Sequence, residues 1–311
     1  MLLSVVICTY NPKKEILNKV FHSLQQQTFD QNNWELILVD NNSTIQLSNE
    51  IDLSWHPNAK ICIENKAGLA HARLRGVNEA KTGLIVFVDD DNLLDENYLK
   101  IAYEFHLSNT QVGCYGGKSL PVFDTVPPDW FFKTGINLGC QDFGDDLYIS
   151  NFKLANFKLA DYPKFAPIGT GMVITKTAFL SYNKEVSNNP IRLSLGRKGK
   201  SLSSGEDNDI IISIVKNGYE IAYLPNLMVK HLIPANRYSK KYIENMAYES
   251  SRSWVKVMNV HDMNPWKAIS PLTIHFRQYK LYFTLKAWKS IENYVSWKVA
   301  CGIIKGRSEI N

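Results

Sequence analysis

Residues 83–88 (GLIVFV) form an entirely apolar run that ends directly in three consecutive aspartates, Asp89, Asp90 and Asp91. A short apolar run bounded by polar residues is typical of a strand that is buried on both faces of a sheet. Residues 4–10 (SVVICTY) and 35–39 (ELILV) show the same pattern, and each is followed by a polar segment. We therefore expect three buried strands that each end in polar residues.

Segments with helical spacing of apolar residues separate these strands. They cover residues 14–26, 68–80 and 96–105, and a weaker strand is expected at 60–64. Strands that alternate with helices in this way predict an α/β fold with a mostly parallel central sheet flanked by helices. Ligands bind outside the carboxyl ends of the strands in such sheets, so the polar segments should meet at one edge.

This alternation ends beyond residue 110. Strands are expected at 113–120, 169–175 and 219–224, a helix at 206–216, a loop at 225–230, and a local duplication of the pentapeptide NFKLA at 151–160. From residue 238 onward the pattern is helical and rich in tryptophan, with prolines that break it into pieces. We expect an α/β domain over residues 1–235 and a basic, aromatic, helical C-terminal extension over residues 236–311.

The cysteines and the N-terminus bear on the cellular compartment. The five cysteines are scattered and include no Cys-x-x-Cys pair, which argues against a disulfide framework or a zinc knuckle and for a reducing compartment. The N-terminus lacks a signal-peptide pattern, and no apolar run approaches the roughly 20 residues that cross a bilayer. We expect a cytoplasmic protein.

The net charge of +5 is unevenly distributed, since residues 235–311 contain 13 Lys+Arg and 5 Asp+Glu. A basic segment suggests an anionic partner, either a membrane surface or a phosphorylated acceptor, although a solvated helical face has the same composition. Basic residues among Trp288, Trp297, Tyr282 and Phe283 fit a peripheral membrane contact, and the same aromatics fit a homodimer. We expect no nucleic-acid partner, because the acidic strand ends would repel phosphate in the absence of a metal ion.

The aspartate triplet indicates a metal site. Adjacent carboxylates repel one another, and a divalent cation with oxygen ligands, Mn²⁺ or Mg²⁺, would hold them together. Such a cation would bridge the phosphates of a nucleoside diphosphate and stabilise it as a leaving group. Side chains alternate along a strand, so Asp89 and Asp91 should face the same way. The alternative is an acidic turn that caps the following helix together with Asp95.

Three further side chains or pairs are candidates for the site. Glu206 and Asp207 precede an apolar helix; either could remove a proton from an acceptor hydroxyl, or both could simply cap the helix. His231 is a candidate metal ligand, although a lone histidine is more often an ordinary surface or core residue. Trp130 could stack on an acceptor sugar or lie in the core.

Five segments in order resemble the inverting glycosyltransferase family 2. They are SVVICTYN, ELILVDNNS, ENKAGLAHARLRGVNEAKTGLIVFVDDDN, GTGMVITK and GEDNDI, and the resemblance covers about residues 3–235. The resemblance implies a GT-A fold, a nucleotide-sugar donor and inversion at the anomeric carbon. It also implies a saccharide or lipid-linked acceptor at the inner face of the membrane, as in cell-surface polysaccharide or glycolipid synthesis.

The resemblance also implies roles for individual residues. Thr9 and Tyr10 would line the base pocket of the donor, and Asp40 would accept a hydrogen bond from the base. Asn65, Gly68 and Arg73 would close over the nucleotide, and Gly169 and Gly171 would lie beneath the sugar. Asp89 would meet the ribose or a metal-bound water, and Asp90 would also bind the donor. The metal would be held by Asp91 and His231, the general base would be Asp207, and Glu206 would lie near the acceptor. In the family pattern Asp40 favours a pyrimidine base, so a uridine diphosphate donor is the first expectation, with guanosine and thymidine forms left open.

Two departures and two alternatives remain. Many family members have asparagine after the Ala-Arg pair, where this chain has Leu74. The basic stretch 192–200 either orders over the diphosphate or is a solvated loop. A sugar-1-phosphate nucleotidyltransferase would usually have a glycine-rich loop after the first strand, where this chain has TYNPKK. A catalytically inactive paralogue that acts as a binding subunit is the other alternative.

Overall fold

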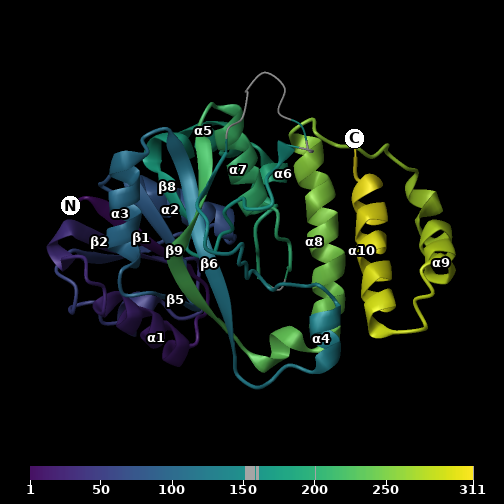
Figure 1. Ribbon diagram of the computed structural model, residues 1–311, viewed down its shortest axis with the longest axis horizontal. Helices are drawn as coiled ribbons and strands as arrows, with labels where there is room; N and C mark the ends of the chain where they lie inside the picture. Colours follow the sequence, from purple (N-terminus) through teal and green to yellow (C-terminus); the bar gives the residue numbers. More distant parts are fainter. Residues whose placement is uncertain (151–157, 159–160, 200, 311) are drawn as a thin grey trace.

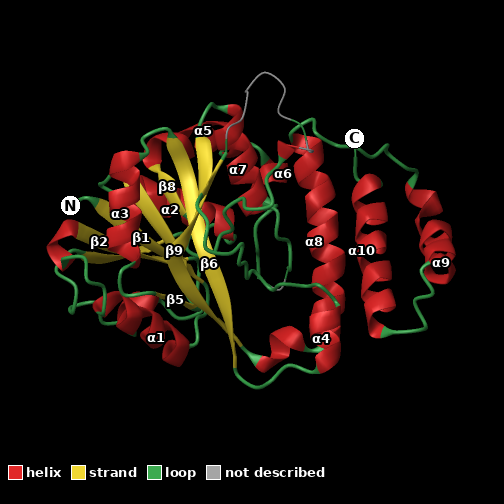
Figure 2. Ribbon diagram, in the orientation of Figure 1, coloured by secondary structure: helices red, strands yellow, loops and turns green. Residues whose placement is uncertain are grey.

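The computed structural model describes residues 1–150, 158, 161–199 and 201–310. A mixed sheet forms its centre, with strand order β3-β2-β1-β4-β8-β6-β9-β5 and with β7 paired to β9 (Figures 1 and 2). The strands are β1 (Leu3–Thr9), β2 (Trp34–Asp40), β3 (Ala59–Ile63), β4 (Leu84–Asp89), β5 (Asn92–Leu94), β6 (Val112–Phe123), β7 (Tyr148–Ile149), β8 (Val173–Thr175) and β9 (Glu220–Ile233).

Helices cover both faces of this sheet and continue beyond it. The α-helices are α1 (Lys14–Gln25), α2 (Leu69–Glu79), α3 (Tyr98–Ser108), α4 (Asp129–Lys133), α5 (Lys176–Val186), α6 (Pro190–Leu193), α7 (Glu206–Lys216), α8 (Lys240–Val260), α9 (Ile274–Thr284) and α10 (Ile291–Arg307). Short 3-10 turns are η1 (Gln31–Asn33), η2 (Leu47–Asn49), η5 (Ala235–Tyr238) and η6 (Pro271–Thr273).

Parallel pairing dominates the sheet. Strand β1 lies parallel to both β2 and β4, β3 lies parallel to β2, and β6 lies parallel to β9. Strands β5, β7 and β8 run antiparallel to their neighbours. The expected α/β fold, a mostly parallel sheet flanked by helices with a helical C-terminal extension, is therefore confirmed.

Side chains that alternate along the central strands build two cores, one on each face of the sheet. Leu3, Val5 and Ile7 of β1 pack with α1 and α3, whereas Val6 packs with α2, α5 and α7 on the opposite face. Helix α2 lies so close to the sheet that a Cβ on Gly76 would stand 2.3 Å from the side chain of Val6. The apolar runs of the sequence are thus buried on both sides, as their composition predicts.

Two sequence predictions about strand length were wrong. The strand expected at 169–175 forms only over β8, because Gly171 adopts a positive φ of 71° and ends the extended chain. The loop expected at 225–230 is part of β9, because a bulge absorbs the strand-breaking residues: Gly117 and Lys118 of β6 pair with Leu224 and Met228, so residues 225–227 have no partner in β6. A Cβ on Gly117 would lie 2.1 Å from the backbone of this bulge.

The C-terminal extension is a set of three helices, with α8 against the α/β part, α10 next to it and α9 outermost (Figure 1). The predicted domain boundary at residues 235 and 236 falls in η5, and α8 shares apolar clusters with the region before it. Within the described residues, none of the helices has the length and apolar character needed to cross a bilayer. The NFKLA duplication at 151–160, apart from residue 158, lies outside the described residues.

Candidate functional site

A cavity of about 780 Å³ opens at the carboxyl ends of β1 and β4. Its size is that of a typical small-molecule site. The sequence-predicted residues that line it are Thr9, Tyr10, Gly68, Arg73, Asp89, Asp90, Asp91, Gly169, Glu206, Asp207 and His231. The polar residues that follow the strands therefore meet at one edge of the sheet, as expected for the carboxyl ends of parallel strands.

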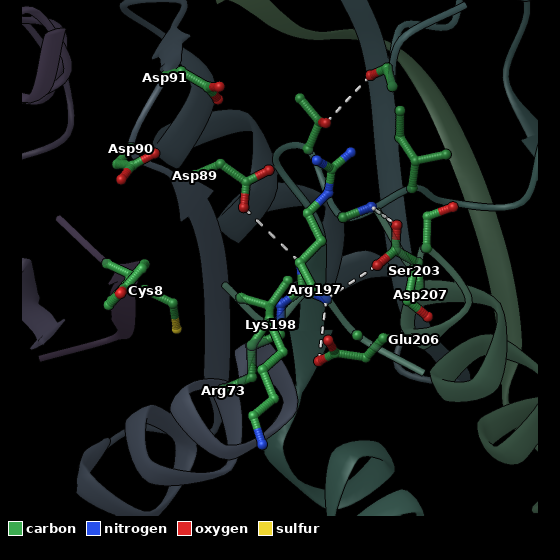
Figure 3. Close-up of a pocket in the computed structure, with 18 of the residues that line it drawn as sticks. Cys8, Arg73, Asp89, Asp90, Asp91, Arg197, Lys198, Ser203, Glu206 and Asp207 are labelled. Carbon is green, nitrogen blue, oxygen red and sulfur yellow. Dashed lines mark hydrogen bonds and ion pairs between the residues drawn. The ribbon is translucent and has the colours of Figure 1, made fainter. Parts of the chain in front are cut away.

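Asp89 is the last residue of β4, and Asp90 and Asp91 form the turn between β4 and β5. Figure 3 shows Asp89 and Asp91 extending toward the same side, with Asp90 turned away from them. The hydroxyl of Thr9 donates a hydrogen bond to Asp90. Asp95, and not the triplet, accepts a hydrogen bond near the start of α3, from the backbone N–H of Asn97 at 3.1 Å. The triplet is thus free of the helix-capping role that was its alternative.

Antiparallel pairing of β5 with β9 brings Asp91 to His231. Asn92 pairs with His231 across the two strands, so that His231 Nε2 lies 3.5 Å from Asp91 Oδ2. Arg237, which follows β9 in η5, places Nη1 3.1 Å from Asp91 Oδ2 and 3.2 Å from His231 Nε2. A positively charged group therefore contacts both side chains that the sequence predicts as metal ligands.

Burial and mutual repulsion shape the charges of the triplet. Burial raises the pKa of Asp89 to about 6 and, together with the charge of Asp91, that of Asp90 to about 7. Burial also acts on Asp91, but the hydrogen bond from His231 and the charges of His231 and Arg237 hold its pKa below the usual value. Asp91 is therefore the carboxylate of the triplet that stays ionised most readily.

The donor set of this pair suits a divalent cation. A carboxylate and an imidazole are common ligands of Mn²⁺, and one or two protein ligands suffice where substrate phosphates supply the rest. Within the described part of the chain, no group of three His, Cys, Asp or Glu side chains is arranged to hold a metal. The metal role of Asp91 and His231 remains a prediction.

Arg73 of α2 joins the two acidic clusters. Its guanidinium lies 3.1 Å from Asp207 Oδ1, 3.4 Å from Glu206 Oε1 and 3.9 Å from Asp89 Oδ1 (Figure 3). The Arg73 side chain is 3% exposed, and the surrounding acids hold its pKa above the usual value in spite of burial. Three carboxylates, rather than solvent, surround this arginine.

The carboxylates of α7 differ in environment. Asp207 is about one-third exposed to the cavity and accepts a hydrogen bond from the backbone N–H of Gly169 at 2.9 Å. Glu206 is buried, and neither of its oxygens has a hydrogen-bond partner within the described residues. Burial raises the pKa of Glu206 to about 7, against the lowering effect of Arg73. Asp207 therefore has the access that a base toward an external hydroxyl needs.

Of the residues predicted to contact the base, Thr9 and Tyr10 line the cavity, whereas Asp40 is not among the described residues that line it. Thr9 and Tyr10 line the cavity at the end of β1. The cavity-lining residues among those described include Asn41 but not Asp40 or Asn65. Both carboxylate oxygens of Asp40 accept backbone N–H groups, from Ser43 at 2.9 Å and Leu47 at 3.0 Å. These contacts stabilise the turn after β2, and the predicted contact of Asp40 with a base remains a prediction.

The two glycines predicted beneath the sugar have different surroundings. A Cβ on Gly169 would stand 2.6 Å from Arg73 Nη2 and 3.0 Å from Asp207 Oδ1, so the missing side chain leaves room for the Arg73–Asp207 contact. A Cβ on Gly171 would meet Val229 and the hydroxyl of Tyr98, away from the cavity. Gly171 serves the packing of α3 on the sheet, whereas Gly169 lies in the site.

Trp130 packs outside the cavity. Its ring is partly buried against the apolar cluster that α4 forms with the end of β9, α8 and α10. These contacts match the core alternative that the sequence left open for this tryptophan. A contact of Trp130 with an acceptor sugar remains a prediction.

Sequence reasoning named Arg197 and Lys198 only as part of the basic stretch 192–200, and it assigned no role to Asn41 or Arg237. Arg197 and Lys198 line the cavity, and the Arg197 carbonyl accepts the Leu69 N–H at 2.9 Å, which ties the basic loop to the start of α2. Asn41 holds the same region, because its Oδ1 accepts the Gly68 N–H at 2.8 Å. The sequence contains no motif that marks Arg237 as a site residue. Only its charge and its position six residues after His231 could have suggested it.

Comparison with known proteins identifies relatives over part of the chain. The sequence is 35% identical over 106 residues to "Glycosyltransferase GlyG" of Streptococcus pneumoniae, a match that covers 33% of this chain and 34% of GlyG. It is 29% identical over 147 residues to "Putative teichuronic acid biosynthesis glycosyltransferase TuaG" of Bacillus subtilis, covering 45% of this chain and 56% of TuaG. The matches thus span a third to about half of these relatives.

Solved structures show the fold. The structure of S. aureus TarS 1-349 in complex with UDP-GlcNAc is 15% identical, covers 99% of this chain and 90% of that chain, and gives a TM-score of 0.54. The complex of the same TarS fragment with UDP gives a TM-score of 0.50 at 15% identity, covering 99% of this chain and 91% of that chain. This likeness confirms the expected GT-A type of fold.

The family pattern provides the link between the sequence segments and this fold. The pattern described as "Glycosyl transferase family 2" matches residues 4–160, which include β1, the aspartate triplet and Arg73. The match covers half of the chain and contains the first three of the five segments on which the resemblance rests. The chain therefore belongs to glycosyl transferase family 2.

Proposed function

We propose that the protein transfers a sugar from a nucleoside-diphosphate donor, with UDP as the first nucleotide to test, to an acceptor hydroxyl with inversion at the anomeric carbon. The observation that carries the proposal is the contact of Arg73 with both acidic clusters, because it places Asp207 beside the edge where Asp89 and Asp91 lie. A base and a site for the leaving diphosphate then share one cavity.

The proposed reaction is a single displacement. Asp207 accepts the proton of the acceptor hydroxyl as its oxygen bonds to the anomeric carbon, and the bond from that carbon to the diphosphate oxygen breaks. Attack from the face opposite the diphosphate inverts the anomeric configuration. The orientation of Asp207 by Arg73 and by the N–H of Gly169 supports this role, since a general base must be held in reach of the proton.

The leaving nucleoside diphosphate carries negative charge that the cavity must neutralise. We propose Asp91 and His231 as the protein ligands of a divalent cation that, when bound, neutralises this charge. The cationic side chains of Arg197 and Lys198 line the same cavity and support a diphosphate site next to the start of α2. A helix N-terminus also favours an anion, which adds to the same effect.

The acceptor and the biological context are extensions of the proposal. The names of GlyG and TuaG place relatives among glycosyltransferases, the second in teichuronic acid biosynthesis. The solved TarS structures bind UDP and UDP-GlcNAc. We accordingly propose a UDP-sugar donor and a saccharide or lipid-linked acceptor in cell-surface polysaccharide or glycolipid synthesis.

Calorimetric titration of UDP tests the donor site. We expect UDP to bind in the presence of Mn²⁺, to bind more weakly without metal, and to lose the metal dependence in Asp91→Ala. Asp52→Ala is the matched control, because Asp52 is an exposed acid remote from the cavity lining. No binding of any nucleoside diphosphate would overturn the proposal and favour an inactive paralogue; binding without sugar transfer or hydrolysis would also favour that alternative.

A further inference from the structure

Helix α9 exposes a stripe of large aromatic side chains at the outer edge of the molecule. Phe276, Tyr279 and Phe283 follow one another at spacings of three and four residues, which places them on one face of the helix. Phe276 is 73% exposed, Tyr279 66% and Phe283 49%. Figure 1 shows α9 as the outermost helix of the C-terminal extension, with α10 between it and α8.

The opposite side of α9 is already anchored. Tyr282 packs edge-on against Trp297 of α10, with the ring centroids 5.2 Å apart, and the Trp297 Nε1–H donates to the Gln278 carbonyl at 2.9 Å. Trp288, which is 54% exposed, packs against Phe283 and extends the aromatic surface into the turn that follows the helix. Phe276 and Tyr279 therefore remain largely exposed, and Phe283 is half-exposed beside Trp288.

Positive charge surrounds this stripe. Residues 271–290 contain four lysine or arginine residues and no aspartate or glutamate. The four are exposed, and within the described residues none of them forms an ion pair. They are Arg277, Lys280, Lys286 and Lys289. We define residues 271–290 as the aromatic–basic face.

The positive charge of the aromatic–basic face distinguishes between its two possible partners, a second copy of the chain and a lipid surface. A two-fold contact with a second copy would place the same lysines and arginines opposite one another, which repels. An anionic lipid surface complements them, and exposed aromatic rings are favourable at the boundary between headgroups and acyl chains. We propose that the aromatic–basic face docks on an anionic phospholipid surface.

Docking in this way would hold the cavity at a fixed relation to the lipid surface. Helix α8 supplies Met246 and Ser250 to the cavity lining and packs on its other side against α10, which carries α9. The inference goes beyond the proposed transfer reaction, and its test uses neither donor nor acceptor. Failure of one proposal therefore leaves the other standing.

Co-sedimentation of the full chain with vesicles provides the test. We expect binding to vesicles of phosphatidylcholine with phosphatidylglycerol, weak binding to phosphatidylcholine alone, and loss of binding as salt is added. Near an anionic surface each basic residue contributes about fivefold to partitioning. The double variants Phe276→Ser/Phe283→Ser and Arg277→Gln/Lys280→Gln should each bind at least tenfold more weakly.

The control is a matched double variant on α3. Leu107→Ser/Lys100→Gln removes one exposed apolar and one exposed basic side chain from a helix far from α9 (Figure 1). Thermal unfolding monitored by circular dichroism checks that each variant folds. In the wild-type chain, brominated lipids should quench tryptophan fluorescence, and Trp288→Phe should reduce this quenching.

Three results would overturn the proposal. The first is a wild-type chain that stays in the supernatant with anionic vesicles and shows no quenching. The second is equal binding by the test variants and the control. The third is self-association in light scattering that the Phe276→Ser/Phe283→Ser variant abolishes, without vesicle binding, which would assign the face to a second copy.

Discussion

Arg73 Nη1 of α2 lies 3.1 Å from Asp207 Oδ1 of α7, across 134 positions of sequence. The same guanidinium approaches Glu206 and Asp89, so one buried cation links the end of β4 to the start of α7. A candidate base is thereby held by a residue that belongs to the family-matched segment. This relationship gives the first two predictions.

Asp207→Asn should abolish most turnover while leaving UDP binding intact. The amide keeps the size of the side chain and can still accept the N–H of Gly169, but it cannot take up a proton. A lost general base costs about 10²–10⁴-fold in rate. Single-turnover sugar transfer measures the rate and calorimetry the binding. Turnover above a tenth of wild type would exclude Asp207 as the base.

Arg73→Ala should destabilise the fold as well as the site. Removing one partner of a buried ion pair leaves the other charges uncompensated, which costs about 3–5 kcal/mol of unfolding free energy. The control is Arg75→Ala on the same helix, because Arg75 pairs with Glu79 at the surface and should contribute about 0.5 kcal/mol or less. Urea denaturation measures the unfolding free energy of both variants. Equal losses of unfolding free energy in Arg73→Ala and Arg75→Ala would contradict the central role of Arg73.

Glu206→Gln should change how stability depends on pH. Burial raises the pKa of Glu206 from 4.5 to about 7, so the folded chain keeps a proton that the unfolded chain has released between these values. The free energy of unfolding should therefore fall as pH rises through this window, by up to about 1.4 kcal/mol per pH unit.

Glutamine cannot ionise, so the variant should lose this part of the slope and become more stable than wild type above about pH 7. Denaturant unfolding at a series of pH values between the two pKa values gives the slope. The control is Glu104→Gln on the exposed surface of α3, which should leave the slope unchanged. Parallel pH profiles of wild type and Glu206→Gln would refute the assignment.

The sequence predicted the α/β architecture and the meeting of its strand ends because both follow from local periodicity. The alternation of apolar side chains is readable in β1, β2 and β4, and the carboxyl ends of parallel strands must share an edge. Asp91 and His231, 140 positions apart, were both named, but the reason they meet is the β5–β9 pairing, which is non-local. No pattern near either residue specifies it.

The parts that failed depend on contacts distant in sequence. Pro225 and Asn226 break a strand by local rules, yet β9 continues because the bulge beside Gly117 accommodates them. Arg237 enters the site only because η5 folds back toward Asp91.

Arg237→Gln should strengthen the binding of Mn²⁺ in the absence of nucleotide. Arg237 places positive charge against both Asp91 and His231, so a metal cation must displace its guanidinium or bind beside it. We expect a gain of about tenfold in affinity, which corresponds to about 1.4 kcal/mol. Arg252→Gln is the control, because Arg252 pairs with Glu309 outside the cavity lining. Calorimetric titration with manganese measures the two affinities. Equal affinities of wild type and Arg237→Gln would show that Arg237 does not compete with the metal.

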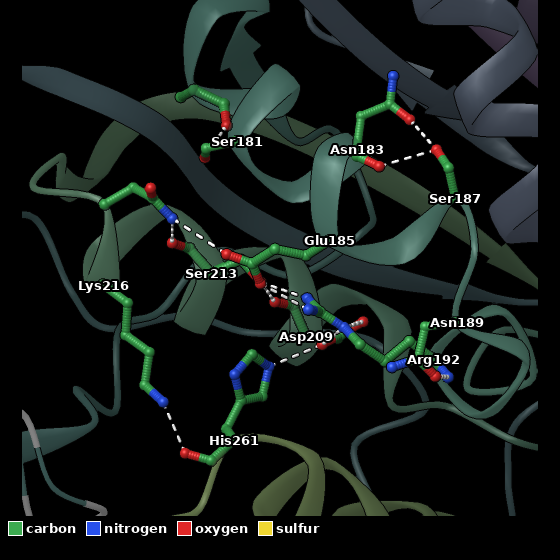
Figure 4. A network of polar contacts seen from close by, with 12 residues as sticks. Ser181, Asn183, Glu185, Ser187, Asn189, Arg192, Asp209, Ser213, Lys216 and His261 are labelled. Carbon is green, nitrogen blue, oxygen red and sulfur yellow. Dashed lines mark hydrogen bonds and ion pairs between the residues drawn. The ribbon is translucent and has the colours of Figure 1, made fainter.

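Asp209→Ala should lower the free energy of unfolding without changing the cavity. Asp209 is fully buried, and Figure 4 shows it between Arg192 and His261, which lie 2.9 Å and 2.7 Å from its Oδ1. The contact ties α7 to α6 and to the end of α8, so its loss leaves a buried guanidinium without its inner partner. We expect a loss of about 3–5 kcal/mol in unfolding free energy.

Glu185→Ala provides the comparison, because Glu185 contacts the same Arg192 at 2.6 Å but is 44% exposed. A surface partner of this kind contributes about 1 kcal/mol or less. Urea denaturation of the two variants therefore separates burial from charge at one arginine. UDP binding by the folded Asp209→Ala protein should match wild type, since Asp209 is not among the described residues that line the cavity. Equal stability losses would show that the burial of Asp209 adds nothing to the link between α7 and α8.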